Sequence, residues 1–183
     1  DDVAHSAVQR WFYTVDPGLE GYAVERKRRA EILDAPLSPL AQHVETVENL
    51  ELATFTSKGL ALGHFDKIGV ANFDPAWAFE GVEIGFKTIV VLGFHHAFDE
   101  ISKAPAPEGG LEVMRQYRRA AHGAKHVANW LREAGWDAEP LTGPMSGKVT
   151  MIPAALASGF GELGKHGSLI TPEFGSSFRL SAV

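Results

Sequence analysis

Residues 152–175 read IPAALASGFGELGKHGSLITPEFG, and this stretch carries the strongest structural signals of the chain. Pro153 favours the first turn of a short helix that runs to Gly159. The four glycines between 159 and 167 then stop the helix and allow tight turns or a close approach of the backbone to another group. Strands are predicted around 168–171 and 177–183, in hairpin-like order across the turn between them.

The same glycines match the dinucleotide-binding pattern G-x-G-x-x-G at residues 159–164. That pattern must leave a strand and open a helix, and an acidic residue must follow about 20 positions later. Here a helix precedes the glycines, and Gly167 and Pro172 prevent a long helix after them. We therefore reject a nicotinamide site. Two interpretations stay open: a helix stop with tight turns, or a backbone surface for a macrocycle, a nucleotide or a neighbouring strand.

Upstream of this stretch, the run IVVL at 89–92 is typical of a central strand covered on both faces. Apolar and small residues recur at helical spacing across 111–134, and Gly135 stands where a helix-ending glycine belongs. Further strands are predicted at 51–56, 67–71 and 136–141. The sequence therefore predicts an α/β (α+β) fold, a mixed sheet flanked by helices.

The first 50 residues differ in texture from the rest. They combine the aromatic triplet WFY at 11–13 with a charged helical stretch at 24–33. We interpret residues 1–50 as an N-terminal appendage and residues 51–183 as the core. Because the last residues alternate like a strand and then stop, we expect the core to be truncated at its C-terminus.

Composition restricts the possible functions. The 183 residues are 45% hydrophobic, enough to bury a core, and their net charge of −6 gives little support to nucleic-acid binding. No apolar run approaches the roughly 18–20 residues of a membrane span. Without cysteine, these residues cannot hold a thiolate-bound zinc or a Cys-ligated iron–sulfur cluster. The chain shows neither an initiator Met nor a leader, so the compartment stays open, with a slight preference for the cytoplasm.

Several histidines are candidates for a site. His122 and His126 stand four apart on the long predicted helix, but no acidic residue accompanies them, which favours ordinary surface or core histidines over a metal site. His95 and His96 end the central strand, where ligands gather, yet they should point to opposite faces.

The remaining candidates also have ordinary structural explanations. Lys165 and His166 could donate to an amide, phosphate or carboxylate of a ligand, or lie on a solvated turn. Arg115, Arg118 and Arg119 are predicted to form a solvated helix face. The large aromatic residues are predicted to fill a core, namely Trp11, Phe12, Trp77, Phe79, Trp130 and Trp136.

The stretch 152–175, followed by RLSAV at 179–183, resembles the hallmark segment of cobalamin-dependent reductive dehalogenases. A second, looser match runs in the same order from residue 89 through the long helix to 130–136. A related pattern occurs in epoxyqueuosine reductases, the other main branch of these corrinoid iron–sulfur enzymes.

The resemblance implies a nitroreductase-like core that holds cobalamin base-off beneath a substrate pocket. It implies that the corrin is contacted by Gly159, Phe160, Gly161, Glu162, Leu163, Gly164, Lys165, His166, Gly167, Ser168, Leu169, Ile170 and Thr171. It also implies that two 4Fe–4S clusters in a cysteine module outside this chain reduce the cobalt to Co(I), which removes halide from an organohalide. Electrons would come from a donor protein or a fused reductase module.

The proton donor implied by the family, a Tyr with a neighbouring Lys, also lies outside these residues. The resemblance therefore places no catalytic residue in this chain, which we expect to be inactive by itself. Epoxyqueuosine reductases carry an acidic proton donor upstream of the glycines, and KVTM at 148–151 offers none, which favours the dehalogenase branch. Three alternatives stay open: an epoxyqueuosine reductase-like enzyme, a non-catalytic cobalamin-binding or processing protein, and a flavin enzyme of nitroreductase type.

Overall fold

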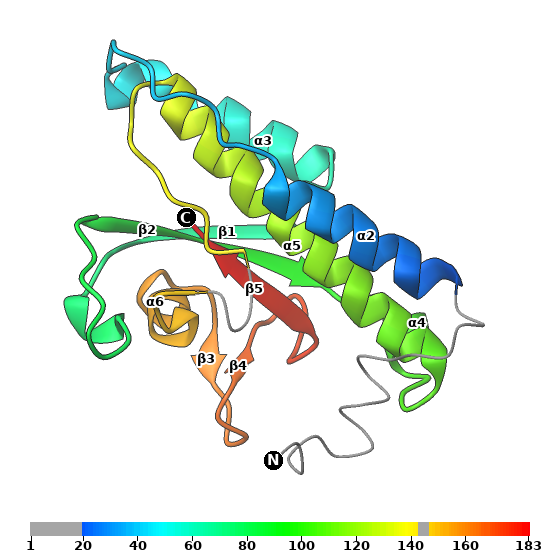
Figure 1. The fold of residues 1–183 in the computed structure, drawn as a ribbon. Helices are drawn as coiled ribbons and strands as arrows, with labels where there is room; N and C mark the ends of the chain where they lie inside the picture. The colour runs from blue at the N-terminus through cyan, green and yellow to red at the C-terminus, as the bar shows by residue number, and fades with distance from the viewer. Residues whose placement is uncertain (1–19, 143–146) are drawn as a thin grey trace.

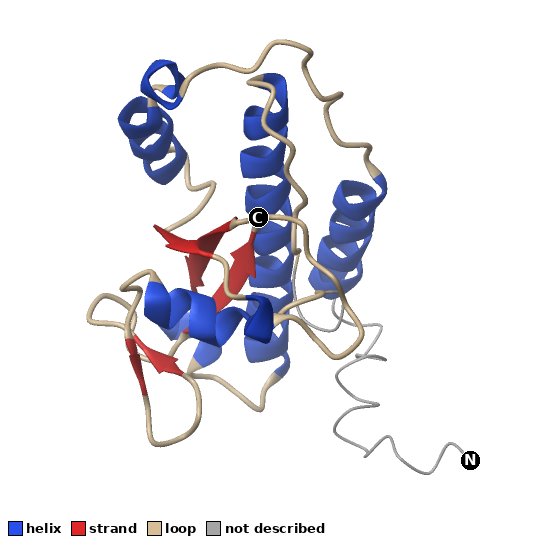
Figure 2. Ribbon diagram, turned by 90° about the vertical axis from the view of Figure 1, so that its left-hand side faces the viewer, coloured by secondary structure: helices blue, strands red, loops and turns tan. Residues whose placement is uncertain are grey.

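The computed structural model describes residues 20–142 and 147–183. In chain order the elements are α2 (Glu20–Asp34), η1 (Val47–Leu50), α3 (Leu52–Ala61), β1 (Lys67–Asn72), η2 (Pro75–Trp77), β2 (Thr88–His95), α4 (Phe98–Ile101), α5 (Pro107–Glu133), α6 (Met151–Ala157), β3 (Glu162–Leu163), β4 (Leu169–Ile170) and β5 (Phe178–Ala182). Helix α5 packs on one face of the main sheet with α2 alongside it, and α6 lies on the other face (Figures 1 and 2).

The main sheet has the strand order β1-β2-β5, and both pairings are antiparallel. The prediction of a central strand is confirmed by β2, whose Val91 lies between Gly69 of β1 and Ala182 of β5. The expected combination of helices and a flanked sheet is also confirmed. The expectation of a mixed sheet is not, because both neighbours of β2 run opposite to it.

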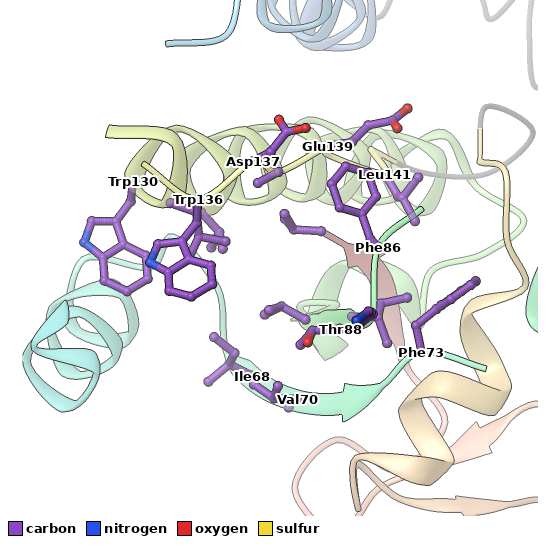
Figure 3. A pocket seen from close by; sticks show the side chains of 18 of the residues that line it. Ile68, Val70, Phe73, Phe86, Thr88, Trp130, Trp136, Asp137, Glu139 and Leu141 are labelled. Carbon is purple, nitrogen blue, oxygen red and sulfur yellow. The ribbon is translucent and has the colours of Figure 1, made fainter. Parts of the chain in front are cut away.

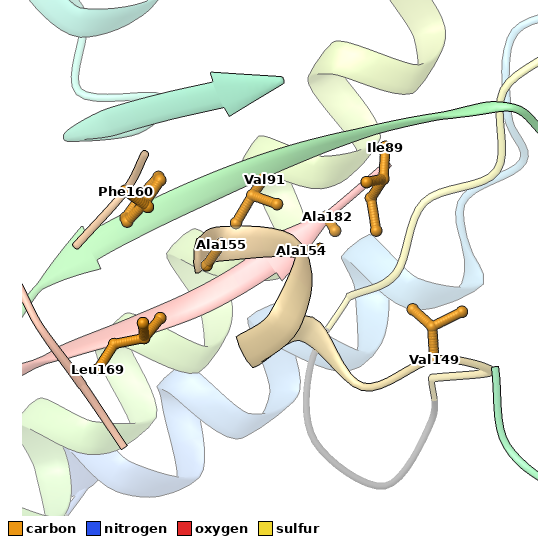
Figure 4. Packing of buried hydrophobic residues seen from close by; sticks show 8 residues of the cluster. All are labelled: Ile89, Val91, Val149, Ala154, Ala155, Phe160, Leu169 and Ala182. Atoms are coloured by element: carbon orange, nitrogen blue, oxygen red, sulfur yellow. The ribbon is translucent and has the colours of Figure 1, made fainter. Parts of the chain in front are cut away.

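Alternation along β2 sends its apolar side chains to both faces and creates two hydrophobic clusters. Ile89 and Val91 face α6 and pack with Phe160 and Leu169 (Figure 4). Leu92 and Phe94 face α5, and they pack with other buried residues, namely Phe65, Ala120 and Val127. The sheet is therefore covered on both sides, as the continuous apolar run predicted.

The predicted long helix is confirmed as α5, which begins four residues earlier than expected, at Pro107. Proline suits this first position because a helix leaves the first amide groups unbonded. The helix ends as predicted at Gly135, whose φ of +86° is accessible to glycine. The N–H of Gly135 donates to Arg132 O and that of Trp136 to Leu131 O, the hydrogen bonds of a Schellman motif.

Two strand predictions and one prediction of strand pairing are wrong. Residues 51–56 belong largely to helix α3, because Phe55 stacks on Trp130 of α5 at 3.9 Å between ring centroids and this contact outweighs local strand propensity. Of residues 136–141, only Leu141 makes a bridge, to Ala182. The strands near the C-terminus do not pair with each other: β4 pairs with β3, and β5 adds to β2.

Helix α2 includes the predicted helical stretch 24–33 and packs along α5. Its buried Glu25 forms an ion pair with Arg118. Arg119 forms a second ion pair with Asp66 at 2.8 Å, and it also donates to Gly63 O. The prediction of a solvated face is therefore wrong for Arg118 and Arg119, because acidic partners from distant segments reach them. Among the described residues, Arg115 forms an ion pair only with Glu112 of its own helix, and its side chain is exposed.

The aromatic triplet at 11–13 lies outside the described residues, and the boundary at residue 50 stays a prediction. Within the described ranges, none of the helices combines the length and apolar character needed to cross a bilayer. Among the aromatics expected in a core, Phe79 is 51% and Trp136 is 40% exposed, whereas Trp77 packs against the buried cluster on the α6 side.

Candidate functional site

The glycine-rich stretch forms a small hairpin that is held to the core at its base. Helix α6 ends in a second Schellman motif, in which the N–H of Gly159 donates to Leu156 O and that of Phe160 to Ala155 O. Gly159 has a φ of +68°, and a Cβ at this position would meet nothing within 4 Å. A helix therefore precedes the glycines, and a strand rather than a helix follows, which agrees with the rejection of a nicotinamide site.

Phe160 anchors this hairpin in the sheet. Its side chain is 1% exposed and lies against two glycines of neighbouring strands. A Cβ at Gly93 would lie 2.7 Å from the ring, and one at Gly69 would lie 3.2 Å from it. The glycines of β1 and β2 therefore make room for Phe160.

The hairpin pairs Glu162 with Ile170 and Leu163 with Leu169. Gly161 permits a close approach of the two strands, because a Cβ there would lie 2.3 Å from the carbonyl oxygen of Ile170. At the tip of the hairpin, the N–H of Gly164 donates to Ser168 O. The tight turns of the first interpretation and the neighbouring strand of the second together account for these glycines.

The base of the hairpin is tied to β1 through Lys67. Its ammonium group contacts Glu173 at 2.8 Å and lies 5.2 Å from the centroid of the Phe160 ring. The hydrogen bond from Lys67 lowers the pKa of the Glu173 carboxyl below its usual value. In addition, the N–H of Phe174 donates to Thr171 Oγ1, which stabilises the turn after the hairpin.

Burial divides the predicted site residues into two groups. Phe160, Leu169 and Thr171 are almost completely buried, so they build the core and are not available to a ligand. The exposed group carries two large apolar side chains, Leu163 and Ile170. Its polar members are Glu162, Lys165, His166 and Ser168. A ligand can therefore reach only the outer part of the predicted stretch.

A second candidate lies on the other side of the sheet, a groove of about 580 Å³ between β1, β2, α3 and the end of α5 (Figure 3). Phe55, Trp130 and Trp136 line one part of it, and Ile68 and Val70 line another. This groove was not expected from the sequence, because a strand was predicted for residues 51–56. Helical spacing of Leu52, Phe55 and Thr56 was the signal that could have indicated it.

The two histidines at the end of β2 point to opposite faces, as predicted. His95 is exposed and stacks on Phe174 at 5.4 Å between ring centroids. His96 is buried, and burial and the nearby Arg179 lower its pKa. These two histidines do not share one pocket.

The pair His122 and His126 is joined by His64 from the segment before β1. The His64 ring lies 4.1 Å from His126 and 5.3 Å from His122, measured between ring centroids. In the part of the chain that the structure describes, no group of three His, Asp or Glu side chains is arranged to hold a metal ion. The imidazoles instead connect α5 to the α3–β1 segment.

This histidine cluster predicts a stability that depends on pH. Burial, together with the neighbouring His64, lowers the pKa of both His122 and His126. A histidine with a lowered folded-state pKa binds fewer protons when folded. Its contribution to stability is complete above the unfolded pKa of about 6.5 and is lost as pH falls below that value.

We therefore expect the free energy of unfolding to decrease from about pH 7.5 to about pH 5, as measured by urea unfolding. His126→Gln should flatten this dependence, whereas His43→Gln, at an exposed position, should leave it unchanged. If the two variants and the wild type gave parallel curves, the histidine cluster would not be the source.

Comparisons with known proteins agree with the resemblance found in the sequence. No family model matches the chain. The tetrachloroethene reductive dehalogenases of Desulfitobacterium hafniense and Dehalobacter restrictus are 31% identical to it over 128 residues, which is 69% of this chain and 22% of theirs. Among solved structures, the catabolic reductive dehalogenase NpRdhA matches with a TM-score of 0.74 and 18% identity, over 88% of this chain and 25% of that one.

A second solved reductive dehalogenase, described in terms of B12-dependent dehalogenation, matches with a TM-score of 0.64 and 19% identity. It covers 92% of this chain and 24% of that one. The chain is thus homologous to a segment of the reductive dehalogenases. It spans about a quarter of the length of the relatives that it matches.

Proposed function

We propose that this chain is the cobalamin-binding segment of a reductive dehalogenase. The observation that carries the proposal is its similarity to tetrachloroethene reductive dehalogenases over 69% of its length. The B12 dependence ascribed to a relative of the same fold supports cobalamin as the cofactor. We also propose that the sheet, covered by α5 and α6, forms part of a nitroreductase-like core.

The outer part of the β3–β4 hairpin fits a large, flat cofactor. Leu163 is 59% and Ile170 is 44% exposed, so this edge presents apolar surface that water does not favour. A Cβ at Gly159 or at Gly167 would meet nothing within 4 Å, so the backbone is open at both positions. These features support a role in which the hairpin edge packs against the corrin.

Within this role, the chain's own residues bind and orient. Lys165 and His166 at the tip are placed to donate hydrogen bonds to amide or phosphate oxygens at the rim of the cofactor. Phe160 and the Lys67–Glu173 ion pair hold the hairpin at a fixed position on the sheet. Bound cobalamin supplies a cobalt centre that, when reduced to Co(I), can remove halide from an organohalide.

The rest of the reaction is assigned to residues outside this chain. Because the chain has no cysteine, the two 4Fe–4S clusters must be held by another part of the protein. We place the proton donor and the contact with the electron donor there as well. We further propose that cobalamin binds in its base-off state.

Leu163→Glu tests the contact directly. The change puts a charge on an exposed position of the hairpin, so the free energy of unfolding should stay within about 0.5 kcal/mol of the wild type. Affinity for cobalamin, measured by difference absorption spectroscopy, should fall at least about tenfold, because the charge would be desolvated against the corrin. Leu62→Glu, at an exposed apolar position on the opposite side of the sheet, is the matched control and should bind as the wild type does.

Lys165→Ala and His166→Ala should have smaller effects on cobalamin binding. A peripheral hydrogen bond contributes about 1 kcal/mol net, so each variant should weaken binding by roughly fivefold. The same spectroscopic titration measures it. A loss in either variant larger than that of Leu163→Glu would show that polar contacts, rather than the apolar edge, dominate this site.

A further inference from the structure

Unpaired polar atoms gather on the face of the sheet that is opposite to the hairpin. Four buried side-chain atoms of the described chain have no hydrogen-bond partner: Arg29 Nε, His96 Nε2, Arg179 Nε and Ser181 Oγ. Burying a polar group without a partner costs free energy, so most such atoms in folded proteins are bonded. Their concentration in one region indicates a missing partner.

The fold explains why these atoms lie in one region. On β5, Phe178, Leu180 and Ala182 pack into the hydrophobic cluster on the α6 side. Alternation therefore turns Arg179 and Ser181 toward α5. His96, in turn, directly follows β2, next to β5 in the sheet.

Two guanidinium groups meet at one aromatic ring in this region. The Cζ atom of Arg179 lies 3.4 Å from the centroid of the Tyr117 ring, and that of Arg29 lies 5.6 Å from the same centroid. Burial lowers the pKa of Arg179, Tyr117 raises it through its charge and a hydrogen bond, and the nearby Arg29 lowers it. Two cations thus share one ring.

The nearby carboxylates are already engaged by other groups. Glu112 accepts hydrogen bonds from the N–H of Ala97 and from the side chain of Gln116, both at 2.7 Å. Glu25 pairs with Arg118 and with Arg28. Across residues 20–142 and 147–183, no ion pair is formed by either Arg29 or Arg179.

A guanidinium group is a fork of N–H donors that matches two oxygens of one anion, and it is rarely buried without such a partner. Arg29, Tyr117 and Arg179 are only half-buried, so part of each side chain stays open to solvent. We propose that Arg29 and Arg179, held by Tyr117 between α2, α5 and β5, form a binding site for an oxyanion, either a carboxylate or an inorganic phosphate-type anion.

This site is independent of the proposed cobalamin contact. The hairpin packs with α6 on one side of the sheet, whereas Arg29 and Tyr117 belong to helices on the other side (Figure 1). Failure of either proposal therefore leaves the other intact.

The test follows the arginine Nε–H resonances of the ¹⁵N-labelled chain by NMR. Sodium phosphate, and separately sodium acetate, replaces sodium chloride at constant ionic strength. We expect a saturable shift of the Arg29 and Arg179 signals. Because a hydrogen bond between charged groups is stronger than one between neutral groups, Arg29→Gln and Arg179→Gln should each weaken binding at least about tenfold.

Arg28→Gln is the matched control, because it removes the same charge from the same helix at an exposed position, and it should bind as the wild type does. Circular dichroism checks the fold of each variant, and Arg29→Gln carries the test if Arg179→Gln does not fold. Saturation by acetate identifies a carboxylate as the ligand type, and saturation by phosphate alone identifies an inorganic anion. The proposal is overturned if neither anion gives a saturable shift, or if Arg29→Gln binds as tightly as Arg28→Gln.

Discussion

Gly161→Val should abolish cobalamin uptake and disrupt the β3–β4 hairpin. A Cβ at this position would lie 2.3 Å from the carbonyl oxygen of Ile170, a distance that real Cβ contacts do not show. The atom in the way is backbone of the paired strand, so the two strands would have to separate. Because Leu163 and Ile170 depend on this pairing for their position, the edge proposed to contact the corrin would be lost with it.

Difference spectroscopy with cobalamin measures the loss of uptake, and backbone NMR of the chain without cobalamin measures the loss of the hairpin. Gly164→Val should act in the same direction but less severely, because the nearest atoms belong to the movable His166 side chain. Gly175→Asn is the control, in the turn after the hairpin and outside the stretch proposed to contact cobalamin. Its φ of +58° is tolerated by asparagine, and no atom lies within 4 Å of the added Cβ. Undiminished binding in both valine variants would contradict the assignment of this hairpin to cobalamin.

Gly123→Val should be the most destabilising single change in the contact between α5 and the sheet. A Cβ at Gly123 would lie 2.5 Å from the carbonyl oxygen of His64 and 2.7 Å from the ring of Phe94. Phe94 is fully buried, so its ring has no free space to move into. Overpacking of a core typically costs about 1–3 kcal/mol and can cost more, and we expect the upper end of this range because backbone is involved.

Urea unfolding measures this effect, and Gly123→Ala gives a sharper form of the test. On an exposed helix surface, a change from glycine to alanine stabilises by about 1 kcal/mol. At position 123 the same change should destabilise, so the sign of the effect reports the contact. An increase in the free energy of unfolding for Gly123→Ala would mean that α5 does not approach the sheet as closely as described.

Local patterns predicted those elements whose burial follows from neighbouring residues. The apolar run at 89–92 predicted the central strand, and the helical spacing of 111–134 predicted α5, because each pattern matches the geometry of one element. The ending of α5 at Gly135 was predicted for the same reason, since the positive φ is a local requirement. The homology to reductive dehalogenases was also readable from the motif at 152–175.

Only the tertiary structure determined the partners of these elements. Residues 51–56 became a helix because Phe55 stacks on Trp130, which lies far away in the sequence. Arg118 and Arg119 do not form the predicted solvated face, because they form ion pairs with Glu25 and Asp66.

The same distinction applies to the candidate site. The sequence by itself determined which residues form the glycine-rich stretch, whereas the structure determined that Phe160, Leu169 and Thr171 belong to the core and that Leu163 and Ile170 form the exposed edge. Spacing along a chain specifies the shape that one segment can adopt. Burial and strand pairing depend on segments that are far apart in the sequence. They are therefore determined only when those segments pack together.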